Sequence, residues 1–119
     1  MILNHVNLEV RDFNAAVRWF ATILGPRASF HSERVATFSF QAMTIVIDAA
    51  AGDAPATLGF ESDDCDRAFQ AIIARGAAPI EEPVNKEWGV RTAYFKGPGA
   101  ITCEIEGPIA NVYPRLAQA

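Results

Sequence analysis

Cysteine is scarce in this sequence. The 119 residues include two cysteines, Cys65 and Cys103, which lie far apart and form no Cys-x-x-Cys motif. This spacing excludes the common zinc-binding and thioredoxin-like arrangements, in which cysteines are grouped. We therefore expect two buried or half-buried thiols in a reducing compartment, the cytoplasm.

Basic residues and long apolar runs are also few. Lys and Arg total 10 against 14 Asp and Glu, which gives a formal net charge of -4. Because nucleic acids and anionic membranes are bound through basic patches, we expect neither as a partner. No apolar run reaches the roughly 18 residues that a membrane span needs. Met1 is followed at once by a strand-like segment, so we expect no signal peptide.

The common catalytic motifs are missing as well. The sequence has no Gly-x-Ser-x-Gly, no P-loop and no dinucleotide-binding fingerprint. Half of the residues are hydrophobic and one fifth are charged, a balance that lets the chain bury a core. The length suits a single domain, which we expect to span residues 1–119.

The strongest positive signal is an internal repeat. Each half begins with a strand-like run, continues with an Asp followed by apolar residues at helical spacing, and ends with three further strand-like runs. This order predicts an α+β fold of two βαβββ modules. The expected bounds are 2–48 for module one, 49–56 for a linker, 57–107 for module two and 108–119 for a C-terminal tail.

Local signals place the elements inside each module. Asp12 and Asp64 are suitable helix N-caps, and Gly25 and Gly76 are suitable stops. Strands are expected at residues 3–10, 27–32, 34–41, 43–48, 57–62, 78–82, 90–96 and 101–106.

The first strand alternates strictly between apolar and polar residues. Its apolar set is expected to face the helix and its polar set to face away from it; the two sets are Val6, Leu8 and Val10, and His5, Asn7 and Glu9. If the two sheets curl toward each other, their polar faces would line one concavity suited to a small ligand. We therefore expect a curved, mostly antiparallel eight-stranded cleft with helices on its convex side.

Two stretches resemble a known family. They are "HVNLEVRDFNAAVRWFATILG" (residues 5–25) and "WGVRTAYFKGPGAITCEIEG" (residues 88–107), at the right separation and with the repeat between them. They resemble the vicinal oxygen chelate superfamily, which includes glyoxalase I, bleomycin-resistance proteins and extradiol dioxygenases. The resemblance covers residues 3–107 and implies the fold. It does not imply a particular reaction, because this fold hosts several chemistries.

The resemblance also implies four metal-ligand positions. Two of them carry ligand-type residues here, His5 and Glu104, while Val46 and Thr57 stand at the other two. A catalytic divalent ion needs at least three protein ligands and an open position. We therefore expect no metal or other cofactor; a bound divalent metal would use His5 and Glu104 with a third ligand outside the pattern.

Eight residues are expected to line the cleft. Tyr94, ten residues before Glu104, resembles a site tyrosine of the fosfomycin-resistance branch. Trp88 is either an aromatic platform for a planar ligand or a core residue, and Arg91 pairs with an anionic group or with a neighbouring carboxylate. The full set is His5, Asn7, Phe38, Phe40, Trp88, Arg91, Tyr94 and Glu104.

Three functions remain open. The first is a metal-free binding protein that resembles bleomycin-resistance proteins and sequesters an aromatic or cationic compound, as in antibiotic resistance. The second is a metal-dependent lyase or dioxygenase of the glyoxalase type, and the third is a structural or regulatory module with a vestigial cleft. Because the exposed sheet edges of so short a chain need cover, we also expect a two-fold homodimer.

Overall fold

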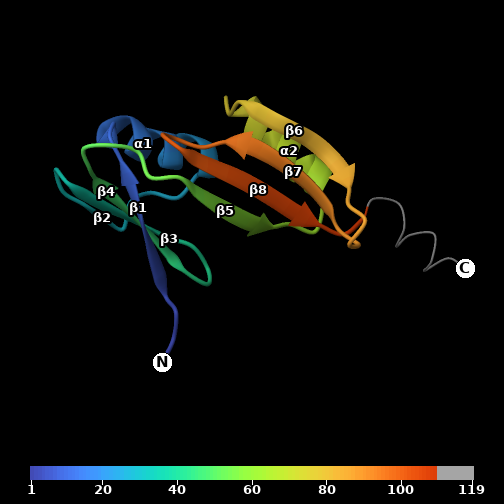
Figure 1. Ribbon diagram of the computed structural model, residues 1–119, viewed down its shortest axis with the longest axis horizontal. Coiled ribbons are helices and arrows are strands. Elements are labelled where there is room, and N and C mark those ends of the chain that lie inside the picture. The colour runs from blue at the N-terminus through green and yellow to red at the C-terminus, as the bar shows by residue number, and fades with distance from the viewer. Residues whose placement is uncertain (110–119) are drawn as a thin grey trace, which may run out of the picture. The chain divides into compact units, whose positions relative to one another are not determined.

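The internal repeat is visible in the order of the elements of the computed structural model, which describes residues 1–109 (Figure 1). Both halves run strand, helix, and three strands, as predicted. The first half contains β1 (His5–Val10), α1 (Phe13–Trp19), η1 (Phe20–Leu24), β2 (Phe30–His31), β3 (Val35–Ser39) and β4 (Thr44–Ala49). The second half contains β5 (Ala56–Glu61), α2 (Cys65–Ala74), β6 (Pro79–Asn85), β7 (Arg91–Lys96) and β8 (Ile101–Gly107).

Each half forms its own four-stranded sheet with the same strand order. The orders are β1-β4-β3-β2 and β5-β8-β7-β6, so the first strand of each half lies beside the last one. β1 and β4 are parallel, whereas β2 with β3 and β3 with β4 are antiparallel. The predicted α+β fold of two βαβββ modules is therefore confirmed. The common cleft between the two sheets stays a prediction.

In the first sheet, one face is buried under its helix. Leu8 and Val10 of β1 are buried, while His5, Asn7 and Glu9 are exposed, as the alternation predicts. Helix α1 begins at Asp12, whose Oδ1 accepts a hydrogen bond of 3.1 Å from the Ala15 N–H. The helix packs its buried side chains against the sheet; these are Phe13, Ala16, Phe20 and Ile23.

The first helix ends where its sequence predicts. From Phe20 on the backbone adopts a π-helix, and the Gly25 N–H donates to the Phe20 carbonyl five residues earlier, at 3.1 Å. Gly25 then takes a φ of 101°, a conformation that favours glycine. Ile23 is buried and Leu24 half-buried at this end.

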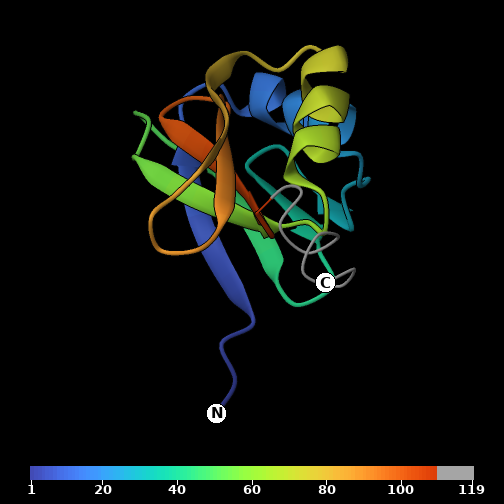
Figure 2. The same cartoon turned by 90° about the vertical axis from the view of Figure 1, so that its right-hand side faces the viewer.

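The second sheet has the same two-sided character. Helix α2 begins at Asp64, whose Oδ1 accepts from the Arg67 N–H at 3.0 Å, and it lies along one side of its sheet (Figure 2). The core residues of β7 and β8 face this helix and alternate with polar residues on the other face. The buried set is Ala93, Phe95, Ile101, Cys103 and Ile105.

Two strands, β2 and β6, depart most from their expected bounds. β2 has only two residues, Phe30–His31, because the chain before it follows the helix end irregularly. β6 runs on to Asn85 and pairs with β7 through two register shifts. Its prolines, Pro79 and Pro83, cannot donate to a neighbouring strand, which suits the outer position that β6 takes in its sheet.

The chain divides into two compact units. Within the described residues, the first unit is Met1–Ala56 with Gly97–Ile101, and the second is Thr57–Lys96 with residues 102–109. The β7–β8 turn therefore belongs to the first unit, beside the segment that joins the halves. Of the predicted tail, 108–119, the part from residue 110 on lies outside the described residues.

The segment between the two sheets is held in place by the end of β1. The N–H groups of Ala50 and Ala54 donate to the carbonyls of Val10 and Glu9, at 2.9 and 3.1 Å. The Arg11 N–H donates to the Asp53 carboxylate at 2.8 Å. The predicted linker is thus a structured part of the first unit.

Candidate ligand-binding site

The helix-free face of the second sheet carries a short hydrogen bond between two predicted site residues. Tyr94 of β7 lies directly opposite Glu104 of β8 in the strand register, and its hydroxyl donates to Oε2 at 2.5 Å. Hydrogen bonds to a carboxylate are short and strong. This bond, with partial burial and the Glu104 charge, raises the pKa of Tyr94 to about 12, so the hydroxyl remains a donor at neutral pH.

A small acidic pocket adjoins this pair. It has a volume of about 220 Å³, and its lining residues are Gly59, Phe60, Glu61, Glu104 and Glu106. Glu104 Oε1 lies 3.6 Å from where a Cβ on Gly59 would stand. The missing side chain at Gly59 therefore leaves room over the carboxylate. Among residues 1–109 no basic side chain lines the pocket, so its chemistry favours a cation.

A buried hydroxyl lies on the same face. Thr92 is two residues before Tyr94, opposite Glu106 in the register, and is only 1 % exposed. Within residues 1–109, its Oγ1 has no hydrogen-bond partner. Buried polar groups are nearly always paired, so this orphan is an unusual feature of the face.

The polar face of β1 is paired with its neighbours. The Asn7 side chain donates to Asp48 Oδ2 at 2.8 Å, and His5 Nδ1 shares a 2.7 Å hydrogen bond with Asn4 Oδ1. In the parallel register Asn7 lies opposite Val46 and Glu9 opposite Asp48. His5 and Asn7 are exposed on this face, where we predicted them.

Phe38 does not lie on the open face. It is fully buried, and its ring stacks on Phe20 with centroids 4.9 Å apart. It therefore packs against the helix with Ala36, which has the same parity in β3, and the expectation that it lines the cleft is corrected. Phe40 follows the end of β3 in a tight turn, where its N–H donates to the Met43 carbonyl at 2.8 Å; its part in a site stays a prediction.

Arg91 also lies on the other side of its strand. It alternates with Tyr94 along β7 and shares the side of Ala93 and Phe95, which faces α2. Its guanidinium donates to both oxygens of Asp66 at 3.0–3.2 Å and to Asn85 Oδ1 at 3.0 Å. Of the two roles considered for it, pairing with a neighbouring carboxylate is the observed one, although the partner is on the helix.

Trp88 is not a core residue. It lies in the connection between β6 and β7, is 66 % exposed, and has Lys86 Nζ 6.0 Å from its ring centroid. This geometry removes the core-packing alternative. A platform for a planar ligand stays a prediction.

The residues present do not fit the metal-ligand set that the resemblance implies. Within residues 1–109, no group of three or more His, Cys, Asp or Glu side chains could hold a metal ion. Val46 and Thr57 supply no suitable donor at two of the four positions, and Glu104 already accepts a hydrogen bond from Tyr94. No step through a metal is derived from this site.

Four of the five pocket residues, Gly59, Phe60, Glu61 and Glu106, are not in the predicted set. Gly59 and Glu61 alternate with buried Leu58 in β5, so their shared face was readable from the sequence. They lie close to Glu104 because β5 is beside β8 in the sheet. The repeat in the sequence does not predict this strand order.

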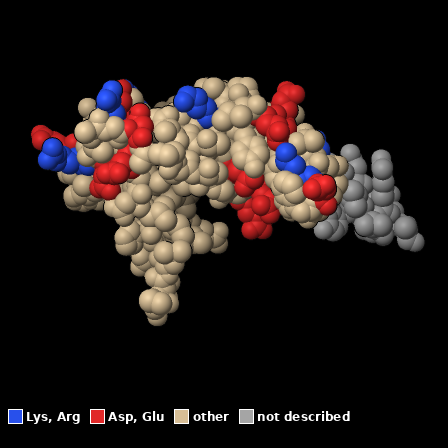
Figure 3. All heavy atoms as spheres, in the orientation of Figure 1, with Lys and Arg blue, Asp and Glu red and all other residues tan. Residues whose placement is uncertain are grey.

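Charge is dispersed over the surface. In the view of Figure 3, Lys and Arg side chains are separated by uncharged and acidic ones. Within residues 1–109, no helix has the length and apolar character to cross a membrane.

Comparison with known proteins places the chain in a family. The model of the Glyoxalase/Bleomycin resistance protein/Dioxygenase superfamily matches residues 2–105. The chain therefore belongs to this superfamily, which confirms the resemblance found in its sequence. A comparison with curated proteins gives no match.

Solved structures of this superfamily share the fold. A glyoxalase/bleomycin resistance protein/dioxygenase from Nocardioides is 19 % identical, with a TM-score of 0.80 over 93 % of this chain and 85 % of that one. TioX from Micromonospora sp. ML1 is 19 % identical, with a TM-score of 0.75 over 92 % and 100 %. Lactoylglutathione lyase from Agrobacterium tumefaciens is 14 % identical, with a TM-score of 0.75 over 88 % and 92 %. At these identities the similarity establishes the fold alone.

Proposed function

We propose that the protein binds a small cationic or aromatic compound without a metal, as bleomycin-resistance proteins of its superfamily sequester their ligands. The observation that carries this proposal is the Tyr94–Glu104 hydrogen bond beside an acidic pocket on a helix-free sheet face. A role in resistance to a cationic antibiotic of the glycopeptide type would follow.

The chemistry of the pocket supports a ligand with N–H donors. Tyr94 uses Oε2 of Glu104, which leaves Oε1 to accept from an ammonium or guanidinium group. Glu61 and Glu106 add negative charge, and Phe60 offers an apolar wall. His5, Asn7, Phe40 and Trp88 belong to the proposal as further ligand contacts.

A thermal-shift screen with cationic, neutral and anionic aromatic compounds tests this function. We expect cationic compounds to raise the melting temperature with rising concentration. Glu104→Gln keeps an acceptor for Tyr94 but removes the charge, and we expect it to weaken binding about tenfold. Glu33→Gln, an exposed acidic residue outside the pocket, is the matched control. Equal binding by Glu104→Gln, or no cationic hit, would overturn the proposal.

Metal analysis separates this proposal from a metal-dependent lyase or dioxygenase. The protein is purified without chelator and its content of Fe, Ni, Zn and Mn is measured. Substoichiometric metal agrees with the binding function. A stoichiometric metal that is lost in His5→Ala would favour the glyoxalase-type alternative instead.

The proposal includes a cytoplasmic homodimer. Both cysteines are free and buried, which suits a reducing compartment. β1 and β5 are outer strands of their sheets, each with an edge that a second copy could cover. Light scattering after size exclusion is expected to give twice the chain mass, and a monomer at micromolar concentration would contradict the dimer.

A further inference from the structure

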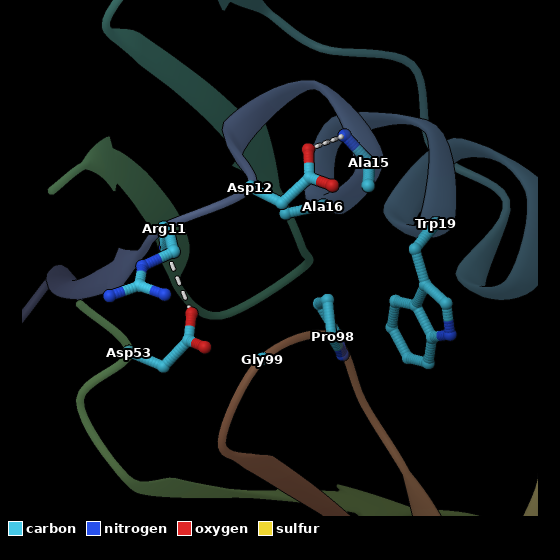
Figure 4. Close-up of a pocket in the computed structure, with 8 residues that line it drawn as sticks. All are labelled: Arg11, Asp12, Ala15, Ala16, Trp19, Asp53, Pro98 and Gly99. Carbon is cyan, nitrogen blue, oxygen red and sulfur yellow. Dashed lines mark hydrogen bonds between the residues drawn. The ribbon is translucent and has the colours of Figure 1, made fainter. Parts of the chain in front are cut away.

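We propose a second binding site, in the first unit, for an organic ammonium ion with an aromatic or other apolar body. The site is a pocket of about 390 Å³ at the start of α1 (Figure 4). Its lining residues are Arg11, Asp12, Ala15, Ala16, Trp19, Asp53, Pro98 and Gly99, all of the first unit. They come from α1 and from chain connections, so this pocket is separate from the open face that carries Tyr94 and Glu104.

One side of the pocket is apolar. Figure 4 shows Trp19 and Pro98 on this side, and Ala15 and Ala16 back it from the helix. Trp19 is half-buried and packs edge-on against buried Phe20, with ring centroids 5.5 Å apart. Because its neighbour Phe20 is fully buried, the indole packs against the core on one side. An indole surface suits an apolar group or the face-on approach of a cation.

The other side carries two carboxylates. Asp12 Oδ1 accepts from the Ala15 N–H at 3.1 Å, and Asp53 Oδ1 accepts from the Arg11 N–H at 2.8 Å. A carboxylate can accept several hydrogen bonds through its two oxygens, so each can also accept from a ligand. These bonds orient the two carboxylates before any ligand arrives.

The charges select a cation over an anion. Two carboxylates line the pocket against one guanidinium, and the Arg11 Nε already donates to the Ala51 carbonyl at 3.1 Å. Figure 4 shows the Arg11 guanidinium beside Asp53, at the end of the pocket away from Trp19. An ammonium near Asp12 and Asp53 would therefore place an attached apolar group against Trp19 and Pro98.

Trp19 can report on this site directly. The chain has two tryptophans, and Trp88→Phe leaves Trp19 as the sole indole. The probe is 2-phenylethylammonium, with neutral 2-phenylethanol and anionic phenylacetate as matched compounds. In the Trp88→Phe protein we expect a saturable change in fluorescence with the ammonium alone.

Conservative variants assign the signal. Asp53→Asn and Asp12→Asn keep an oxygen that accepts the backbone N–H and remove the charge, and we expect each to weaken binding about tenfold. Asp64→Asn makes the same change at the N-cap of α2, and no effect is expected there. Glu104→Gln separates this site from the proposed function, because it removes one of the three carboxylates of the pocket in the other unit and is expected to leave the Trp19 signal unchanged.

Four results would overturn the second site. The first three are no saturable change, an equal response to 2-phenylethanol, and equal weakening by Asp53→Asn and Asp64→Asn. Loss of the Trp19 signal in Glu104→Gln would also overturn it, since the ligand would then act through the open face. The two proposals can fail separately. If Glu104→Gln does not weaken binding in the thermal-shift screen, the proposed function fails, and the test of the second site by Trp19 fluorescence is unaffected.

Discussion

At the scale of single residues, Tyr94 shows how one hydrogen bond sets the chemistry of a face. Its hydroxyl donates to Glu104, and this bond, together with burial and nearby carboxylates, raises the Tyr94 pKa from 10.0 to about 12. The carboxylate is thereby held at a fixed orientation with one oxygen left for a ligand. A fixed acceptor loses less freedom on binding than a mobile one.

The raised Tyr94 pKa predicts a dependence of stability on pH. A group whose pKa is higher in the folded than in the unfolded state stabilises the protein fully below its unfolded value, here 10.0, and loses this effect as pH rises to about 12. We therefore expect the wild type to lose more unfolding free energy across this range than Tyr94→Phe, as measured by urea denaturation. Tyr113 is present in both proteins, so the difference isolates Tyr94. Parallel pH profiles would contradict the assignment.

At the scale of elements, the contact of Phe20 with Phe38 joins the first helix to β3. Both rings are fully buried and stacked, which explains why the face of β3 was misassigned from the sequence. Phe38 and Phe40 alternate with polar residues in the sequence. This alternation predicts a strand with two different faces, but it does not show which face packs against the helix. Arg91 is a similar case, since the strand alternates correctly but its ion-pair partner, Asp66, comes from α2.

The role of Phe38 in the core predicts a large loss of stability. Phe38→Ala is expected to lower the unfolding free energy by about 4 kcal/mol, because a buried ring is replaced by a cavity. Phe30, which is 57 % exposed in β2, is the matched control, and Phe30→Ala is expected to change stability by less than about 0.5 kcal/mol. Chemical denaturation gives both values. A Phe38→Ala protein of wild-type stability would argue against the core position.

At the scale of the whole molecule, most of the fold could be predicted from the internal repeat. The two modules, their caps at Asp12 and Asp64, and the alternation of β1 and β8 were all predictable, because they depend on local spacing. The grouping of Gly59 and Glu61 with Glu104 was not predictable, because it depends on the order of the strands in the sheet. The assignment of the β7–β8 turn to the first unit was equally hidden, since residues 97–101 carry no mark of their distant neighbours.

The fit of this turn against the linker predicts a cost for a side chain at Gly99. Its φ is +59°, and a Cβ there would lie 2.6 Å from Asp53 Oδ1. We expect Gly99→Ala to lower the unfolding free energy by about 2 kcal/mol, as measured by denaturation. Gly89→Ala, with φ +96° but open space, isolates the backbone cost of about 1 kcal/mol, and Gly52→Ala is expected to be near neutral. Equal losses at Gly99 and Gly89 would show that Asp53 moves aside freely.

The membership of Gly97–Ile101 in the first unit has a consequence for biosynthesis. Domains usually fold from the N-terminus as the chain leaves the ribosome. Here the N-terminal unit lacks one of its own pieces until residue 101 has been synthesised, long after its four strands are complete. The nascent first half therefore lacks this turn until most of the second half has been made, and a gene truncated at the repeat boundary would encode a first unit without it.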